Sequence, residues 1–147
     1  MHFHEDVLAI CDLFPRSVLK ISEHDVFTGT PPLAFTFGLG GLLLFPLRYG
    51  ASSVLPERYT PWGLLQTITD HQVTVCYTAP TCYRQMIPLL PEADIRSLRT
   101  VVSAGEVLPV ATRTAFEAAS GLTMTDGIGS TEMLHIFISA AGNDVRA

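Results

Sequence analysis

Two kinds of hydrophobic pattern alternate along the chain. Short runs of β-branched and aromatic residues are typical of buried strands, whereas apolar residues three and four positions apart are typical of helices that pack one face on a core. The runs predict strands over residues 26–30, 51–55, 73–79, 100–104 and 122–125. The spacing predicts helices over residues 4–14, 37–49, 62–71, 81–90 and 110–120. This alternation indicates βαβ units, so we expect an α/β fold with a doubly wound, mostly parallel sheet and flanking helices.

Proline and glycine mark the ends of these helices. Pro61 precedes Trp62 in a first turn, where its missing N–H costs no hydrogen bond, and Pro80 opens the helix over residues 81–90. Pro15 is expected to close the first helix, and Gly121 the last one. Residues 139–147 have a turn-like composition, and no closing element is predicted there.

Composition and charge narrow the class of protein. With 147 residues, 48% of them hydrophobic and 16% charged, the chain has the size and content of one folded domain. Its 9 basic and 14 acidic residues are spread without blocks, so no footprint for nucleic acid or an anionic membrane is present. A small ligand or a protein partner is expected instead, and the oligomeric state is left open.

The cysteines and the apolar runs bear on the compartment. Cys11, Cys76 and Cys82 are an odd number in apolar settings without CxxC spacing, which predicts reduced thiols and a cytoplasmic protein. The first residues carry acids and no basic region, which argues against a signal peptide. The apolar run 32–47 approaches the length of a membrane span, but a buried helix is favoured because the segments after it indicate a soluble α/β domain.

Three loops follow predicted strands directly, at residues 78–80, 103–106 and 126–132. In doubly wound sheets, ligands bind beyond the carboxyl ends of the strands. The last loop, Asp-Gly-Ile-Gly-Ser-Thr-Glu, offers glycines for close backbone approach, two hydroxyls for phosphate and a carboxylate for a divalent cation. This composition favours a nucleotide-phosphate and metal site; the alternative is a strand-to-helix turn with Ser130 or Thr131 as its N-cap.

Several common sites are not supported. The glycine spacing does not match GxGxxG, and GxxxxGK[ST] is absent. Ser103 lacks the GxSxG context of a nucleophilic serine, and no CxxC or HExxH spacing joins the histidines and cysteines into a metal set.

Three segments together resemble the adenylate-forming (AMP-binding) superfamily, which includes acyl- and aryl-CoA synthetases, luciferases and peptide-synthetase adenylation domains. Residues 127–132 resemble its aromatic-Gly-x-Thr-Glu motif, residues 103–109 its adenine-side loop, and residues 32–41 the segment that opens its central helix and lines the acyl pocket. The extension over residues 129–137, Gly-Ser-Thr-Glu-Met-Leu-His-Ile-Phe, is similar to the benzoate- and 2-aminobenzoate-CoA ligase branch. The resemblance covers nearly the whole chain and implies part of the large N-terminal domain of an adenylate-forming enzyme.

The resemblance also implies roles for the matched residues. Thr131 would bind the nucleotide phosphate and Glu132 would coordinate Mg²⁺ as the two catalytic positions. ATP or AMP would contact Ser103, Ala104, Gly105, Glu106, Asp126, Gly127, Ile128, Gly129, Ser130 and Thr131. An aromatic carboxylate would lie near Thr36, Phe37, Gly38, Thr78, Ala79, Ile128 and His135. CoA would be the co-substrate of the parent reaction. For His135 the alternative is a structural histidine, the commoner role of a lone histidine in an apolar stretch.

Parts of the family pattern have no counterpart in these residues. They are the Ser/Thr/Gly-rich phosphate loop with its lysine, the aspartate that holds the ribose, and the C-terminal domain. We therefore expect residues 1–147 to be a partial AMP-binding domain with little or no adenylation activity alone. The parent would be an ATP-dependent ligase that converts a benzoate- or 2-aminobenzoate-type acid to an acyl-adenylate and then to a CoA thioester. The alternatives are a non-catalytic module that binds AMP or an aromatic acid, and a truncated gene product without a stable native state.

Overall fold

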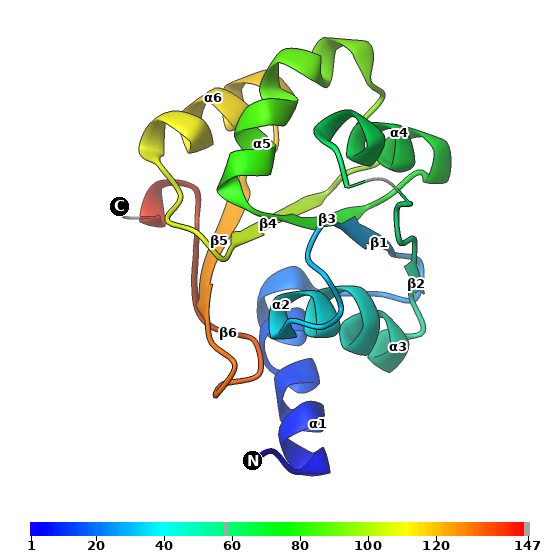
Figure 1. The fold of residues 1–147 in the computed structure, drawn as a ribbon, viewed down its shortest axis with the longest axis vertical. Coiled ribbons are helices and arrows are strands. Elements are labelled where there is room, and N and C mark those ends of the chain that lie inside the picture. Colours follow the sequence, from blue (N-terminus) through cyan, green and yellow to red (C-terminus); the bar gives the residue numbers. More distant parts are fainter. Residues whose placement is uncertain (58, 146–147) are drawn as a thin grey trace.

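A computed structural model describes residues 1–57 and 59–145 of the chain. Its centre is a six-stranded sheet with the order β2-β1-β3-β4-β5-β6 (Figure 1). The strands are β1 Val26–Gly29, β2 Ser52–Ser53, β3 Val75–Thr78, β4 Thr100–Ala104, β5 Met124–Gly129 and β6 Ile136–Ala141. Strands β1 to β5 pair in parallel, and β6 runs antiparallel to β5. The predicted α/β fold with a mostly parallel sheet is confirmed.

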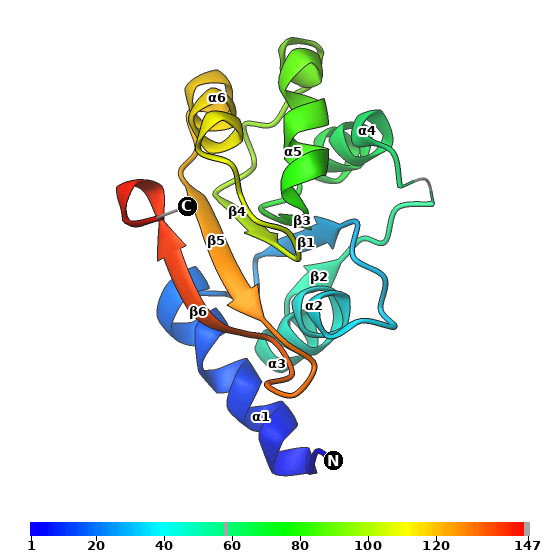
Figure 2. The same cartoon turned by 60° about the vertical axis from the view of Figure 1, so that its left-hand side comes forward.

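Helices cover both faces of this sheet (Figure 1, Figure 2). One face carries α4 Pro61–His71, α5 Pro80–Met86 and α6 Val110–Ser120. The other face carries α1 His4–Asp12, α2 Thr36–Leu39 and α3 Phe45–Tyr49. Short π-helical turns occur at Pro15–Leu19 and Gly40–Leu44, and 3₁₀ turns occur at Ile87–Glu92 and Gly142–Asp144.

Local side-chain chemistry sets several helix ends. The Thr60 hydroxyl accepts a hydrogen bond from the Gly63 N–H at 3.1 Å, and Pro61 occupies the first turn of α4 as predicted. Gly121 ends α6 with φ +73°. Pro15 does not close helical structure but starts a new turn, because a first helical position needs no N–H donor. Helix α5 ends before the predicted boundary, since Pro88 cannot donate to the helical ladder.

The apolar run over residues 32–47 contributes a helical segment that packs closely on the sheet. It passes from α2 through the π-helical turn Gly40–Leu44 into α3. A Cβ on Gly40 would lie 2.4 Å from Cδ2 of His135, and one on Gly41 would lie 2.6 Å from Cδ1 of Tyr77. The missing side chains therefore let this segment approach both rings. Within the described part of the chain, no helix has the length and apolar character to cross a membrane.

Two predictions about the C-terminal region are wrong. Strand β5 continues to Gly129, so residues 126–129 of the expected loop over residues 126–132 are strand. Residues 136–141 form β6, which pairs with β5 as the edge strand in a region where no strand was predicted. The reason is long-range pairing: β5 gains an antiparallel partner that supplies hydrogen bonds to its last residues. Arg146 and Ala147, at the end of the predicted open segment, lie outside the described residues.

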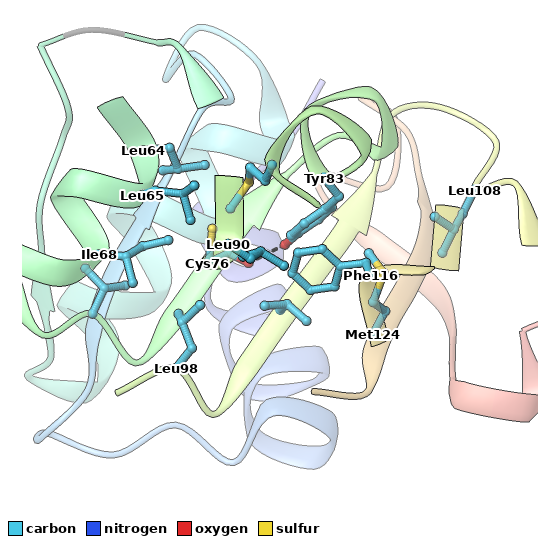
Figure 3. Packing of buried hydrophobic residues seen from close by; sticks show 13 residues of the cluster. Leu64, Leu65, Ile68, Cys76, Tyr83, Leu90, Leu98, Leu108, Phe116 and Met124 are labelled. Carbon is cyan, nitrogen blue, oxygen red and sulfur yellow. Dashed lines mark hydrogen bonds between the residues drawn. The ribbon is translucent and has the colours of Figure 1, made fainter. Parts of the chain in front are cut away.

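A hydrophobic core lies between the sheet and helices α4, α5 and α6 (Figure 3). The Tyr83 hydroxyl lies 3.1 Å from the carbonyl oxygens of both Cys76 and Val102, so its proton is shared between two adjacent strands. Its ring meets the Phe116 ring edge-on at a centroid distance of 4.8 Å. Tyr83 therefore joins β3, β4 and α6 through one buried side chain.

The three cysteines are free thiols, with Cys11 and Cys76 buried and Cys82 half-buried. Burial raises the pKa of each thiol above its usual range. The thiols are therefore protonated near neutral pH, which makes them poor nucleophiles and metal ligands.

An ionic cluster lies at the amino-terminal ends of the parallel strands β1, β3 and β4. The buried Asp25 carboxylate, at 3% residue exposure, accepts hydrogen bonds from Arg99 at 2.6 and 2.8 Å and from Thr74 Oγ1 at 2.7 Å. The Ser22 N–H donates to it at 2.8 Å. Burial acts to raise the pKa of Asp25, but the hydrogen bonds from Arg99, Ser22 and Thr74 outweigh it and lower the pKa to about 2.

Acid should weaken the fold through Asp25. Its folded-state pKa is depressed, so its stabilisation is present above the unfolded pKa near 4 and is lost as the pH falls through about 2. The difference in unfolding free energy between the parent and Asp25→Asn should shrink by about 2–3 kcal/mol between pH 5 and pH 2. Urea titrations at several pH values measure it. A pH-independent difference would contradict this role.

Candidate functional site

Two adjoining cavities lie at the carboxyl ends of β4 and β5. The smaller, of about 190 Å³, is lined by Thr36, Phe37, Ala104, Gly105, Gly129, Ser130, Thr131, His135 and Ile136. The larger, of about 490 Å³, is lined by Gly105, Glu106, Val107, Leu108, Asp126, Gly127, Ile128 and Gly129. Gly105 and Gly129 line both, so the two spaces meet there. The structure thus gathers residues from all three matched segments at one edge of the sheet.

His135 lies at the inner end of the smaller cavity and is only 2% exposed. Its ring lies 4.5 Å from that of Phe45 and 5.9 Å from that of Phe37, measured between centroids. Among the described residues, neither ring nitrogen has a hydrogen-bond partner. Burial lowers the pKa of His135 to about 4, against a smaller opposing effect of the Phe37 backbone, so the ring is neutral at pH 7. A buried neutral imidazole with unpaired nitrogens can bind a polar group of a ligand.

Tyr77 belongs to the same aromatic group and was missed by the sequence analysis. Its ring lies 5.4 Å from Phe37 and 6.1 Å from His135, and its buried hydroxyl has no partner among the described residues. A tyrosine inside a β-branched strand was the available indication, because a buried phenol requires a hydrogen-bond partner. Ile136, which lines the smaller cavity, was missed because β6 was not predicted.

The two glycines of the 126–132 segment allow close packing between β5 and β6. Gly127 and Gly129 are strand residues and are not among the glycines with positive φ. A Cβ on Gly127 would lie 2.6 Å from the Ile136 side chain, and one on Gly129 would lie 2.8 Å from the His135 carbonyl oxygen. Their lack of side chains lets β6 and the preceding turn approach β5. Gly105 differs, since its φ is +86° and a Cβ there would meet nothing within 4 Å.

Residues 130–134 form the turn between β5 and β6. The Ser130 hydroxyl accepts from the Met133 N–H at 3.3 Å, so it caps this turn, but the helix expected in the capping alternative does not follow. Thr131 lines the smaller cavity, and its carbonyl oxygen lies 3.1 Å from His2 Nε2. Glu132 instead borders a separate cavity of about 740 Å³ between α1 and β6. Thr131 and Glu132 therefore face different spaces.

Asp126 lines the larger cavity and pairs across β5 and β4 with Ser103, which lies outside the linings of both cavities. Burial raises the pKa of Asp126, opposed by the Ser103 hydroxyl and the Gly127 N–H. Asp126 Oδ1 and Ser103 Oγ are buried and have no partner in hydrogen-bond geometry among the described residues. The carboxyl of Asp126 therefore keeps one buried oxygen without a hydrogen-bond partner beside the larger cavity.

Three predicted acid-site residues lie outside the linings of both cavities. The buried Thr78 hydroxyl pairs with the Thr30 hydroxyl, and Ala79 is the residue before α5. Gly38 packs against the loop before α2, where an added Cβ would lie 2.3 Å from the Pro32 carbonyl oxygen. Ile128, also expected at the acid, borders the larger cavity.

The possible metal ligands near the turn at residues 130–134 would supply only part of the coordination of a cation. Within residues 1–57 and 59–145, no three His, Cys, Asp or Glu side chains gather as a metal-binding group. The exposed Glu132 carboxyl has a lowered pKa, because its own N–H, the Ser130 hydroxyl and the charge of His2 favour the ionised form. Mg²⁺ commonly takes one or two carboxylates and completes its shell with phosphates and water. A single ionised carboxylate is compatible with that arrangement.

Comparison with known proteins identifies the family. The chain matches the AMP-binding enzyme family over residues 1–147. It is 41% identical to a benzoate–CoA ligase of Thauera aromatica over 99% of its length, and 33% identical to an anthranilate–CoA ligase of Pseudomonas aeruginosa over 100% of its length. It spans 28% of each of these relatives.

Solved structures give the same result. An anthranilate CoA ligase in complex with anthranoyl-AMP superposes with a TM-score of 0.91 at 40% identity, covering 99% of this chain and 29% of that one. A benzoate CoA ligase from Burkholderia xenovorans superposes with a TM-score of 0.87 at 36% identity, covering 99% and 30%. The chain therefore belongs to the AMP-binding enzyme family, and its relatives include aryl-CoA ligases.

Proposed function

We propose that this chain forms the aryl-acid and adenine side of the active site of an ATP-dependent aryl-CoA ligase. The parent reaction would join an aromatic carboxylate to AMP with release of pyrophosphate and then transfer the acyl group to CoA as a thioester. The observation that carries the proposal is the meeting of two cavities of different size and lining at Gly105 and Gly129. The relatives named above are ligases of benzoate and anthranilate.

The larger cavity suits a nucleobase. Its volume of about 490 Å³ lies in the usual range for small-molecule sites. Ile128 and Val107, at 61% and 81% exposure, offer apolar surface to a flat ring. Asp126, which lines this cavity, would supply a carboxylate acceptor for the exocyclic amino group of adenine.

The smaller cavity suits a single aromatic ring. At about 190 Å³ it is below the usual range for drug-sized ligands, and Phe37 gives it an aromatic wall. Neutral His135 has one N–H, which would donate a hydrogen bond to a carboxylate that reaches the ring. Because the ring carries no charge at pH 7, His135 orients the acid without an ion pair.

Ser130 and Thr131 line the smaller cavity directly after Gly129, which borders both cavities, so their hydroxyls would serve the phosphate that joins the two ligands. Glu132 would hold Mg²⁺, which when bound would neutralise phosphate charge. Residues 1–147 would then be a partial AMP-binding domain that works with the phosphate loop and the C-terminal domain of a longer enzyme.

A second candidate is a non-catalytic module that binds AMP or an aromatic acid. One observation favours it: Glu132 borders a different cavity from Thr131, so the expected phosphate and metal ligands do not converge. Binding without turnover is its expected behaviour.

Calorimetric titration with benzoate tests the acid site. His135→Phe keeps an aromatic ring beside the smaller cavity but removes both nitrogens. We therefore expect about tenfold weaker benzoate binding and unchanged AMP binding. His71→Ala, at an exposed histidine of α4, is the control. Equal benzoate affinity in the parent and His135→Phe would contradict the assignment.

Turnover and binding separate the two candidates. We expect little or no ATP–pyrophosphate exchange with benzoate or 2-aminobenzoate by these 147 residues alone. Robust exchange would contradict the partial-domain proposal. Binding of AMP that is insensitive to Glu132→Ala and to Mg²⁺, in a chain without turnover, would favour the non-catalytic module.

A further inference from the structure

Glu106 makes a contact that its expected place beside adenine does not explain. Its Oε2 atom accepts hydrogen bonds from the Thr81 hydroxyl at 2.6 Å and from the Thr81 N–H at 3.1 Å. Thr81 is the second residue of α5, which follows β3, whereas Glu106 follows β4. The contact thus joins two loops at the carboxyl edge of the sheet across 25 residues of sequence.

The loop that contains Glu106 has few other restraints. Gly105 has a φ of +86° and open space where a side chain would lie, and Val107 is 81% exposed. The loop regains the core only at Leu108, which is 2% exposed. Within residues 1–57 and 59–145, no other hydrogen bond holds Glu106 or Val107. The carboxylate therefore restrains the segment between the Gly105 turn and the Leu108 anchor.

This segment is one wall of the larger cavity. Residues 105–108 form one side, and residues 126–129 of β5 form the other. The β5 side is held by sheet pairing, with β4 and β6 at residues 126 and 127 and with β6 at residues 128 and 129, whereas the other side depends on the Thr81 contact. A carboxylate is suited to this task because one oxygen can accept both Thr81 donors, and charged acceptors form stronger hydrogen bonds.

We propose that Glu106 is a positioning residue: it holds residues 105–108 against the start of α5 and so sets the wall of the nucleotide cavity without contacting the nucleotide. The proposal rests on the proposed function for its ligand, AMP. It assigns Thr81, which was not among the expected ligand contacts, as the hydrogen-bond donor that holds Glu106 in place.

AMP titration of single and double variants tests the assignment. Glu106→Ala and Thr81→Val should each weaken AMP binding by about three- to tenfold. The double variant should bind AMP no more weakly than the single variant with the lower affinity, because both substitutions break the same contact. Thr81→Ser and Glu106→Gln keep the hydroxyl donor and the acceptor oxygen and should restore most of the affinity. Thr67→Val, which removes a threonine hydroxyl from α4, is the matched control and should bind AMP like the parent.

Direct contact with AMP predicts another pattern. Loss of affinity in Glu106→Ala with parental affinity in Thr81→Val would overturn the positioning role. If the losses of AMP affinity in the two single variants multiply in the double variant, Glu106 and Thr81 do not act through one shared contact. Thr81→Val changes only an exposed contact, so it keeps the test valid if Glu106→Ala folds poorly.

Hydrogen–deuterium exchange without ligand gives an independent measurement. The Thr81 N–H, which donates to Glu106 Oε2 at 3.1 Å, should exchange several-fold faster in Glu106→Ala than in the parent, and at the parental rate in Thr67→Val. Failure of the parent to bind AMP would count against the proposed function alone. Exchange of the Thr81 amide at the parental rate in Glu106→Ala would overturn the restraint itself.

Discussion

Alanine in place of Arg99 should lower the unfolding free energy of this chain by about 3 kcal/mol. The substitution leaves the buried Asp25 carboxylate without the two charge-assisted hydrogen bonds at 2.6 and 2.8 Å. It also removes the donor to the Leu19 carbonyl oxygen at 2.9 Å, which ties the segment before β1 to the start of β4. Unpaired buried charge is among the few single changes that cost this much.

Urea denaturation followed by circular dichroism measures this effect. Arg96→Ala is the matched control, because Arg96 also pairs with an aspartate at 2.6 Å but its side chain is 90% exposed. Exposed pairs contribute about 0–1 kcal/mol, so the control should change little. Equal costs for the two substitutions would show that burial of Asp25 does not matter. A non-cooperative transition in the parent would instead support the truncated product without a stable native state.

Gly40→Ala should destabilise the chain by about 1–3 kcal/mol through overpacking at the smaller cavity. The new Cβ would lie 2.4 Å from Cδ2 of His135. The imidazole has little room to move, because the rings of Phe14, Phe37, Phe45 and Tyr77 surround it at centroid distances between 4.5 and 6.1 Å. The segment of Gly40 must therefore shift away from the sheet.

A double-mutant cycle with His135→Ala isolates this clash. Gly40→Ala should cost much less in the His135→Ala background, because the added methyl group enters space that the imidazole has vacated. Chemical denaturation of the four proteins gives the coupling energy. Additive costs would contradict the close packing of Gly40 on His135.

Local sequence patterns accounted for the main architecture. The alternation of β-branched runs with helical spacing predicted the parallel strands β1 to β5, since the two periodicities report directly which residues face a core. Pro61 and Gly121 marked helix ends because their backbone preferences act within one turn. The motifs at residues 103–109 and 126–132 pointed to the carboxyl edge of the sheet and to the family, which is confirmed.

Contacts between residues far apart in sequence were decided only by the tertiary structure. β6 was missed although residues 136–138 are Ile-Phe-Ile, because an antiparallel edge strand depends on its neighbour. The same pairing gives Gly127 and Gly129 their role at the β6 interface, a role that composition alone assigned to ligand approach. No local pattern indicates which distant surface a glycine must accommodate.

Two polar pairs of the structure also could not be predicted from local sequence. Asp25 and Arg99 are 74 residues apart, and Thr81 and Glu106 are 25 apart, so neither pair has a helical or strand spacing that could reveal it. The sequence by itself determined the parallel α/β framework, the family and the edge of the sheet that carries the candidate site. The tertiary structure decided which side chains face each cavity and which ones hold its walls, because burial and hydrogen-bond geometry exist only once the strands are in register.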